Sequence, residues 1–255
     1  MKLVSFNVWG GTIYEPLVDY IGKLSADTDI FCFQEVFSSL PGAPIISSGA
    51  RMFLFEELSV LLKDFSGFFD LRSEGFDFNG KINAPVSHGL ATFIRKGLNV
   101  TSINSKIIDE VGEYADRLVK AQILTLNSEG KTLTIINFHG IALPGEKLDT
   151  PERISQSEKL SVVWRSLGNG EKILCGDFNL MPETKSIKIL EACGRNLIKD
   201  FNIKNTRNKV SWKRFNSKQK FADYCFVSSG VEVQGFEVPY TEVSDHLAMI
   251  LEFSF

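Results

Sequence analysis

Residues 172–182, "KILCGDFNLMP", decide how this sequence is interpreted. The apolar run Lys172–Cys175 is typical of a buried strand that ends at Gly176, and Asp177 and Asn179 follow directly. Open α/β sheets tend to place their chemistry at the carboxyl ends of strands, so a carboxylate and an amide here indicate an active site. A strand followed by an Asx-type turn explains the same residues. The rest of the chain has to decide between these two interpretations.

The composition is that of an ordinary globular protein. The chain has 255 residues, of which 44% are hydrophobic and 23% are charged, enough to bury a substantial core. Because no low-complexity linker or internal repeat occurs, we expect one domain over residues 1–255. No apolar run is long enough to cross a bilayer, and the amino terminus lacks the pattern of a secretory signal. We therefore expect a soluble protein, and a monomer.

The cysteines indicate where the protein works. Cys32, Cys175, Cys193 and Cys225 show no close metal-ligand spacing. Three of them lie in strand-like apolar runs, where a free thiol behaves as a small hydrophobic side chain. We therefore expect a reducing, cytoplasmic location.

The charge is acidic overall but basic in one segment. A net charge of -3 argues against a protein that coats nucleic acid through bulk electrostatics. Residues 204–220 nevertheless hold seven Lys or Arg and no acid, with aromatic residues interleaved. Such a segment could bind a polyanion, with Trp212 and Arg214 as candidate contacts. A solvated basic loop is the alternative.

Strand-like and helix-like segments follow each other along the chain. Strands are expected at residues 3–8, 30–36, 89–94, 118–126, 133–138, 172–175, 222–227 and 247–253. Helices are expected at residues 16–25, 52–62, 151–167 and 184–193, the third with Thr150 as N-cap and Pro151 at its first position. Because some strands follow each other directly, a purely parallel sheet does not fit. We predict an α/β (α+β) fold of mixed sheets with helices packed outside.

Two segments have the composition of long loops. They are residues 38–51 and residues 66–88, and the second carries four phenylalanines. We expect these rings to anchor the loop to the body of the protein, and both loops could also line the rim of a cleft.

Polar side chains lie at the margins of five further strand-like segments. These are Asn7, Glu35, His139, Asp223 and the neighbours Asp245 and His246. Taken singly, each has a structural explanation, such as a buried salt bridge for Glu35 or a hydrogen-bonded core histidine for His139. If they converge, they form an oxygen-rich site suited to Mg²⁺ or Mn²⁺ and poor for zinc.

Such a set of side chains suits the hydrolysis of a phosphodiester. The catalyst must neutralise the negative oxygens, orient a water in line and stabilise the departing alkoxide. A divalent cation on Glu35 meets the first need, Asp177 can hold the water, and His246 can bind the nonbridging oxygens. No serine lies in a nucleophile-elbow sequence and no Gly-rich phosphate loop occurs, which disfavours acyl transfer and nucleoside-triphosphate chemistry.

Six short motifs in order resemble a known superfamily. The motifs are "FNVWG", "FQEVF", "NFHG", "GDFNLMP", "FADYCFVS" and "SDHLAM", and they span residues 6–249. They resemble the endonuclease/exonuclease/phosphatase superfamily, which has the deoxyribonuclease I-like fold. The resemblance implies a four-layered α/β sandwich, with two mixed β-sheets face to face, helices outside and the site at one edge.

The resemblance also implies a metal site. Glu35 would be the main ligand of a Mg²⁺ ion, for which Mn²⁺ is a possible substitute. Asn7 would lie close by, and Asp245 would lie beside the metal.

The catalytic roles implied by the resemblance fall on the remaining motif residues. Asp177 would position and activate the attacking water, and Asn179 would help to hold the water and the phosphate. Asp223 would orient His246, and His139 would hydrogen-bond the phosphate. Since abasic-site endonucleases carry a tyrosine-containing segment in place of the histidine motif, His139 points away from that activity.

Two further residues are candidates for substrate binding. Arg117 lies at a strand start where the family often has a basic residue, although an ion pair with Asp116 or Glu113 explains it equally well. His88 precedes a strand as His139 follows one.

The sequence therefore predicts a Mg²⁺-dependent phosphodiesterase, with a nuclease acting on DNA or RNA as the first hypothesis. A phosphomonoesterase or lipid phosphodiesterase of the same superfamily is the alternative. A binding module that kept the fold without the chemistry is a third hypothesis, which the complete set of motif residues disfavours.

Overall fold

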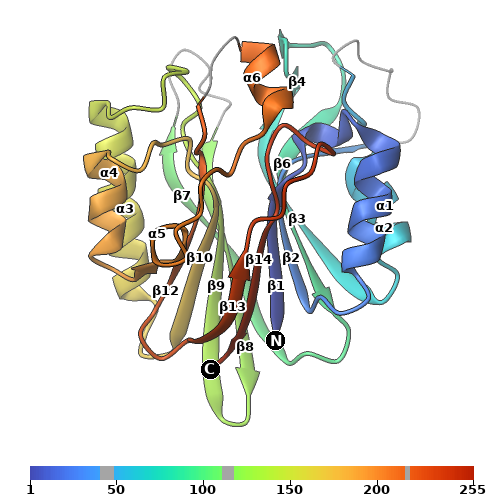
Figure 1. Ribbon diagram of the computed structural model, residues 1–255. Coiled ribbons are helices and arrows are strands. Elements are labelled where there is room, and N and C mark those ends of the chain that lie inside the picture. Colours follow the sequence, from blue (N-terminus) through green and yellow to red (C-terminus); the bar gives the residue numbers. More distant parts are fainter. Residues whose placement is uncertain (41–48, 111–117, 216–218) are drawn as a thin grey trace.

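Two β-sheets packed face to face, with helices on both outer sides, form four layers in the computed structural model (Figure 1). The structure describes residues 1–40, 49–110, 118–215 and 219–255, and of residues 110, 214 and 215 it describes the backbone only. The predicted α/β sandwich of mixed sheets is thus confirmed.

Each large sheet has one parallel pair of strands at its centre. The first sheet has the order β13 (Glu232–Glu237), β14 (Met249–Ser254), β1 (Lys2–Asn7), β2 (Ile30–Ser39), β6 (Val86–Arg95) and β3 (Phe65–Glu74). The second has the order β11 (Arg195–Asn196), β12 (Asp223–Val227), β10 (Glu171–Asp177), β9 (Lys131–His139), β8 (Leu118–Ser128) and β7 (Val100–Glu110). Only β1–β2 and β9–β10 are parallel among these pairs. The carboxyl ends of both pairs therefore meet the amino ends of the antiparallel neighbours β12 and β14 at one edge.

Helices cover the outer faces of the two sheets because each helix has residues along one side that are buried against its sheet. The first sheet is covered by α1 (Tyr14–Leu24) and α2 (Leu54–Leu61), and the second by α3 (Pro151–Ser166) and α4 (Lys185–Glu191). In α1 the buried residues are Leu17 and Ile21, four apart. The predicted N-cap of α3 is confirmed, since the Thr150 side chain accepts a hydrogen bond from the backbone N–H of Arg153. The short helices η1 (Trp9–Gly11), α5 (Leu197–Asp200) and α6 (Lys209–Phe215) lie in connections.

The layer between the sheets changes from apolar to polar along the strands. On β1 and β2, Leu3, Ile30 and Cys32 belong to the apolar cluster between the sheets. Further along, Gln34 is fully buried and donates from Nε2 to Oδ1 of Asn137 on the opposite sheet at 2.7 Å. This paired amide layer separates the apolar core from the polar edge.

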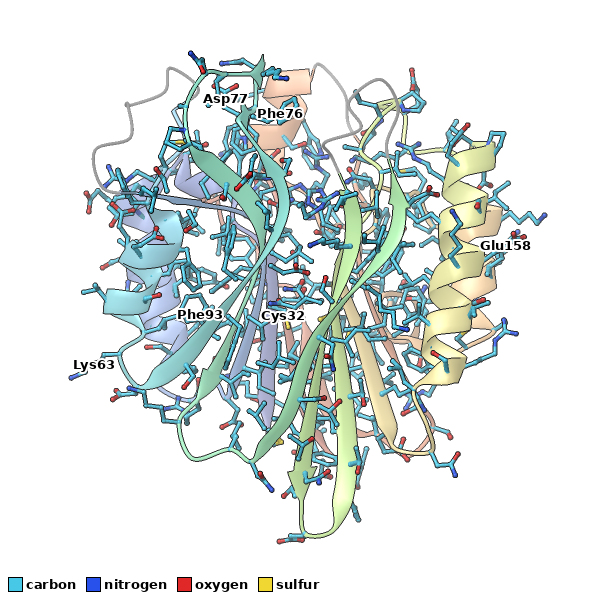
Figure 2. The ribbon with its side chains drawn as sticks, turned by 180° about the vertical axis from the view of Figure 1, so that it is seen from behind. Cys32, Lys63, Phe76, Asp77, Phe93 and Glu158 are labelled. Carbon is cyan, nitrogen blue, oxygen red and sulfur yellow. The ribbon has the colours of Figure 1, made fainter. Side chains whose placement is uncertain are left out.

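One predicted loop is wrong. Residues 66–88 contain most of β3, the start of β6 and a small hairpin of β4 (Phe76–Asp77) and β5 (Gly80–Lys81). Figure 2 shows Phe76 and Asp77 at the end of the molecule that also carries α6. The ring of Phe76 is buried, as expected for an anchoring phenylalanine. Of the predicted loop 38–51, residues 41–48 lie outside the described part of the chain.

Two observations bear on the environment of the protein. All four cysteines are free thiols, and Cys32, Cys175 and Cys225 are buried. Among the described residues, no helix combines the length and apolar character needed to cross a membrane.

Candidate active site

The polar residues predicted at strand ends converge at one edge of the sandwich. Asn7 ends β1, His139 ends β9 and Asp177 ends β10, while Asp223 begins β12. Asp177 is in register with both His139 and Asp223 in the second sheet. Across the two sheets, Nδ2 of Asn7 donates to Oδ2 of Asp177 at 3.0 Å. Strand ends far apart in the sequence thus meet at a single place.

Glu35 reaches this place through a β-bulge. The register between β2 and β6 shifts between Phe33 and Val36, and Glu35 has a φ of 57°, which is unusual for a residue with a side chain. Its Oε1 lies 3.8 Å from Nε2 of His139. Burial raises the pKa of Glu35, and the nearby Asp245 carboxylate raises it further, to about 7. A carboxylate in such a place is costly to ionise without a cation.

The "GDFN" segment is both a turn and part of the site. Gly176 has a φ of 138°, and a Cβ there would lie 1.9 Å from the carbonyl oxygen of Phe138, so only glycine fits. The backbone N–H of Asn179 donates to Oδ1 of Asp177 at 2.8 Å, an Asx-type turn. Burial would raise the pKa of Asp177, but the neighbouring His246 and His139 outweigh it and hold that pKa below its ordinary range. The predicted Asx-type turn is thus confirmed, and it places Asp177 among the converging strand-end residues.

A carboxylate orients His246. Its Nδ1 lies 2.9 Å from Oδ2 of Asp223, which leaves Nε2 facing Asp177, with 3.6 Å to Oδ2 of that residue. Burial alone would lower the pKa of His246, but the Asp223 carboxylate outweighs it and raises the pKa to about 9. This imidazole is therefore a protonated donor at neutral pH, whereas burial lowers the pKa of His139 well below its ordinary value.

Asp245 completes the ring of acids. Its Oδ2 accepts from the guanidinium of Arg207 at 2.9 Å, and its Oδ1 lies 3.9 Å from Nε2 of His246. Oδ1 is buried and has no hydrogen-bond partner in the described structure. Nδ2 of Asn179 and Nδ1 of His139 are buried and without a partner in the same way. Buried polar atoms of this kind are expected where a ligand binds.

The donor set fits a hard divalent cation. Glu35, His139 and Asp177 each offer a ligand atom, and these atoms lie within 4.8 Å of one another. A second group of close ligand atoms, Asp177, Asp223 and His246, contains the Asp223–His246 ion pair, so its imidazole is already engaged. Carboxylate oxygens dominate and no thiol takes part, so the chemistry of the donors suits Mg²⁺ or Mn²⁺ better than zinc.

Two basic residues near the site were not predicted individually. Lys147, in the connection between β9 and α3, is 4% exposed, and its ammonium donates to Oδ1 of Asn179. Arg207 is 4% exposed and pairs with Asp245. Neither follows a strand, so the strand-end pattern could not identify them.

The predicted substrate-binding residues have varied positions. The ring of His88 packs against Phe37 with 4.8 Å between centroids, and its charge lowers the pKa of His139. Trp212 is half-buried and donates from Nε1 to the carbonyl oxygen of Gln219 at 2.9 Å. Arg214 lies in α6, where only its backbone is described, and Arg117 lies outside the described residues.

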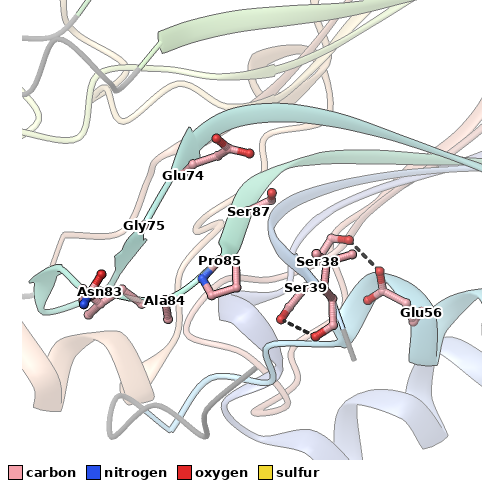
Figure 3. Close-up of a pocket in the computed structure, with 11 residues that line it drawn as sticks. Ser38, Ser39, Glu56, Glu74, Gly75, Asn83, Ala84, Pro85 and Ser87 are labelled. Carbon is pink, nitrogen blue, oxygen red and sulfur yellow. Dashed lines mark hydrogen bonds between the residues drawn. The ribbon is translucent and has the colours of Figure 1, made fainter. Parts of the chain in front are cut away.

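A separate pocket of about 700 Å³ opens beside β2 and the β3–β6 connection (Figure 3). It is lined by Ser38, Ser39, Glu56, Glu74, Asn83 and Ser87, among others. Ser38 donates from Oγ to Oε1 of Glu56 at 2.5 Å, as the dashed line shows. None of the converging strand-end residues lines this pocket.

Comparison with known proteins gives the family and the fold. The model of the Endonuclease/Exonuclease/phosphatase family matches residues 4–246. A solved endonuclease/exonuclease/phosphatase from Bacteroides vulgatus is similar, with 16% identity, a TM-score of 0.71, and 99% of this chain and 98% of that chain covered. No protein of curated function matches significantly.

Two further solved structures resemble this chain but differ from each other in name. One is the Bacteroides thetaiotaomicron mannosyl-6-phosphatase, with 17% identity, a TM-score of 0.68 and full coverage of both chains, 100% and 100%. The other is the human Nocturnin catalytic domain with a bound sulfate anion, with 18% identity, a TM-score of 0.68, and 100% of this chain and 93% of that chain covered. At these identities the likeness shows the fold alone.

Proposed function

Because the chain belongs to the Endonuclease/Exonuclease/phosphatase family, we propose that it is a phosphoesterase that needs Mg²⁺ or Mn²⁺ and hydrolyses phosphodiester bonds by in-line attack of water. One observation carries the proposal. Acidic and imidazole groups from both sheets face one another across 3.6–3.8 Å, with Asp177 between His139 and His246. An arrangement of this kind has groups for a cation, a water and a phosphate at once.

Asp177 holds the attacking water in this mechanism. The imidazoles around it keep the carboxylate ionised, and hydrogen bonds from Asn7 and from the backbone of Asn179 fix both of its oxygens. Each carboxylate oxygen keeps a further lone pair, so Asp177 can accept a hydrogen bond from the water and direct its oxygen at phosphorus.

Donors around Asp177 bind the phosphate oxygens. His246 is protonated and directs Nε2–H toward the site because Asp223 occupies its other nitrogen. Nδ2 of Asn179 is buried and keeps its hydrogen-bonding capacity for a ligand, and Nε2 of His139 faces the same place, 3.6 Å from Oδ2 of Asp177. Preorganised donors of this kind stabilise the charge that develops on the oxygens in the transition state.

Glu35 would hold the divalent cation, with Asn7 and Asp245 beside it. When bound, the cation would neutralise phosphate charge and favour departure of the alkoxide. The raised pKa of Glu35 and the unpartnered Oδ1 of Asp245 support a cation at this position.

Nucleic acid is the substrate we favour. The basic segment 204–220 includes α6, which lies at the end of the molecule where the strand ends converge (Figure 1). Lys213 and Lys220 are exposed there, whereas Lys209 pairs with Glu242 at 2.7 Å and Arg207 is buried. A polyanion would bind the exposed lysines, and Trp212 and Arg214 remain candidate contacts.

A substrate panel tests this proposal. Single-stranded DNA, duplex DNA, RNA, bis(p-nitrophenyl) phosphate, a sugar phosphate and phospholipid vesicles would each be incubated with the protein and Mg²⁺ and, in parallel, with Mn²⁺. We expect metal-dependent cleavage of a nucleic acid and of bis(p-nitrophenyl) phosphate. Release of phosphate from the sugar phosphate alone would favour a phosphomonoesterase, and cleavage of phospholipid alone a lipid phosphodiesterase. No turnover of any substrate with either metal would favour a noncatalytic binding module.

A further inference from the structure

The connection between β9 and α3 is held rigidly against the site. Arg153 is fully buried, and its guanidinium donates to the carbonyl oxygens of Ile141 at 3.3 Å, Ala142 at 3.1 Å, Leu148 at 2.7 Å, and also Pro144. At the other end, Asp149 accepts from the backbone N–H groups of Lys185 at 2.7 Å and Ser186 at 3.0 Å. Arg153 therefore holds the connection together from inside, and Asp149 ties it to the start of α4.

Lys147 is the residue that this connection places in the site. Its carbonyl oxygen accepts from the backbone N–H of Met181 at 2.8 Å. Its φ of 59° is costly for a residue with a side chain, and such a conformation persists only where the surroundings impose it. Backbone strain of this kind is often found next to functional groups, and here it aims the side chain at Asn179.

The Lys147 ammonium has too few partners for a buried charge. It donates to the neutral Oδ1 of Asn179, and in the described part of the chain no carboxylate oxygen lies within 4.0 Å of it. An ammonium has three donors and needs compensation when it leaves water. An anion bound at this position would supply that compensation.

The same contact fixes the orientation of Asn179. Because a lysine can only donate, the amide oxygen must face Lys147, and Nδ2 must face the other way. Nδ2 is the buried amide nitrogen without a partner. Lys147 and Asn179 therefore present two adjacent groups of donors beside Asp177.

We propose that Lys147 is a catalytic residue whose ammonium binds a nonbridging phosphate oxygen next to Nδ2 of Asn179. The inference rests on the proposed function, since it assigns a phosphate ligand to the same site. The charge distribution agrees with it: Lys147 acts on Asp177 as a cation, and Arg207, the other cation that acts on Asp177, is already paired with Asp245 at 2.9 Å. The phosphate would lie beside Lys147 and Asn179, and the metal beside Glu35.

The test compares two buried lysines. Lys147→Met removes the charge in the site, and Lys172→Met removes a lysine whose ammonium donates to the carbonyl oxygens of Gly168 and Gly170, near the opposite end of β10. Binding of inorganic phosphate to the metal-free protein would be measured by calorimetry, together with thermal unfolding. We expect Lys147→Met to weaken phosphate binding at least tenfold without lowering the midpoint of unfolding, and Lys172→Met to lower the midpoint while phosphate binding is unchanged.

Further variants separate a phosphate ligand from a packing role. Ethylammonium should restore part of the phosphate affinity of Lys147→Ala, and Lys147→Arg should retain part of it. Equal phosphate affinity in the wild type and Lys147→Met would overturn the inference, even if the wild type hydrolyses phosphodiesters. If no substrate is hydrolysed but phosphate binding depends on Lys147, the inference stands as a phosphate site and the proposed hydrolase fails.

Discussion

Nδ1 of His246 lies 2.9 Å from Oδ2 of Asp223, and both side chains are buried. The ion pair links a residue three positions before β14 of the first sheet to the first residue of β12 in the second sheet. It therefore joins the two halves of the sandwich at the edge where the site lies.

Removing the Asp223 charge should reverse the shift of the His246 pKa. In the metal-free wild type we expect the imidazole to titrate near pH 9, and in Asp223→Asn below its ordinary 6.5, because burial then dominates. Imidazole resonances followed by NMR across pH would measure both values. An unchanged titration in the variant would contradict the assigned ion pair.

The same shift should make stability depend on pH. Above about pH 6.5 the unfolded chain releases the proton of His246, whereas the folded protein keeps it up to about pH 9. The contribution of this proton to the free energy of unfolding is therefore complete below pH 6.5 and is lost as pH rises through about 9. It should amount to on the order of 3 kcal/mol of unfolding free energy. Urea unfolding of the wild type and of Asp223→Asn would check this, since the variant should show a smaller loss between these pH values.

Glu35→Gln should abolish the stabilisation that a divalent cation provides. At a free metal concentration about 100 times the dissociation constant, binding adds about 2.7 kcal/mol to the wild type. The matched control is Glu74→Gln, which removes a carboxylate from the separate pocket of Figure 3. Thermal unfolding with and without Mn²⁺ should show the shift in the control but not in Glu35→Gln. The reverse pattern would place the cation in the pocket instead.

Gly176→Ala should destabilise the protein far more than an alanine at another left-handed glycine. A Cβ at Gly176 would lie 1.9 Å from the carbonyl oxygen of Phe138, whereas at Gly130, with φ of 79°, it would meet nothing within 4 Å. We expect a cost of at least about 3 kcal/mol for Gly176→Ala and about 1–2 kcal/mol for Gly130→Ala. Equal losses in urea unfolding would show that β9 and β10 do not pack as closely as described.

The amides between the sheets should be coupled in a double-mutant cycle. Asn137→Leu removes the 2.7 Å hydrogen bond of the buried Gln34 amide and leaves it the bond to the carbonyl oxygen of Cys32 at 3.1 Å, which should cost about 1–3 kcal/mol. In Gln34→Leu/Asn137→Leu both polar groups are gone, so the total loss should be smaller than the sum of the single losses. Additive losses in urea unfolding would contradict a direct contact between these residues.

The strand-end residues could be predicted from the sequence because the topology is simple. Parallel central pairs bring carboxyl ends to one edge, so Asn7, His139 and Asp177 needed only a correct strand assignment. Glu35 was identified because a carboxylate is unexpected in an apolar run, although the bulge that turns it into the site carries no such signal. The structure brings all of them together.

Lys147, Arg207 and the edge strands could not be predicted in this way. Lys147 lies in a polar connection whose path depends on the buried Arg153, and Arg207 lies in a basic segment whose composition suggested a solvated loop or a binding surface. The edge strands β3 and β7 lack the alternation that marks a half-buried strand, and β13 is a short edge strand in which only Phe236 is buried. Such features depend on tertiary contacts rather than on local pattern.

The hydrolysis of bis(p-nitrophenyl) phosphate by Asp177→Asn tests the central claim most directly. The control is Asp200→Asn, which removes an exposed carboxylate paired with Arg195 at 3.1 Å. With Mg²⁺ present, we expect kcat/KM to fall about a thousandfold in Asp177→Asn, because the variant loses the group that holds and activates the water, and to stay unchanged in Asp200→Asn. A folded Asp177→Asn protein that keeps the activity of the wild type would contradict the claim that this carboxylate directs water at the phosphate.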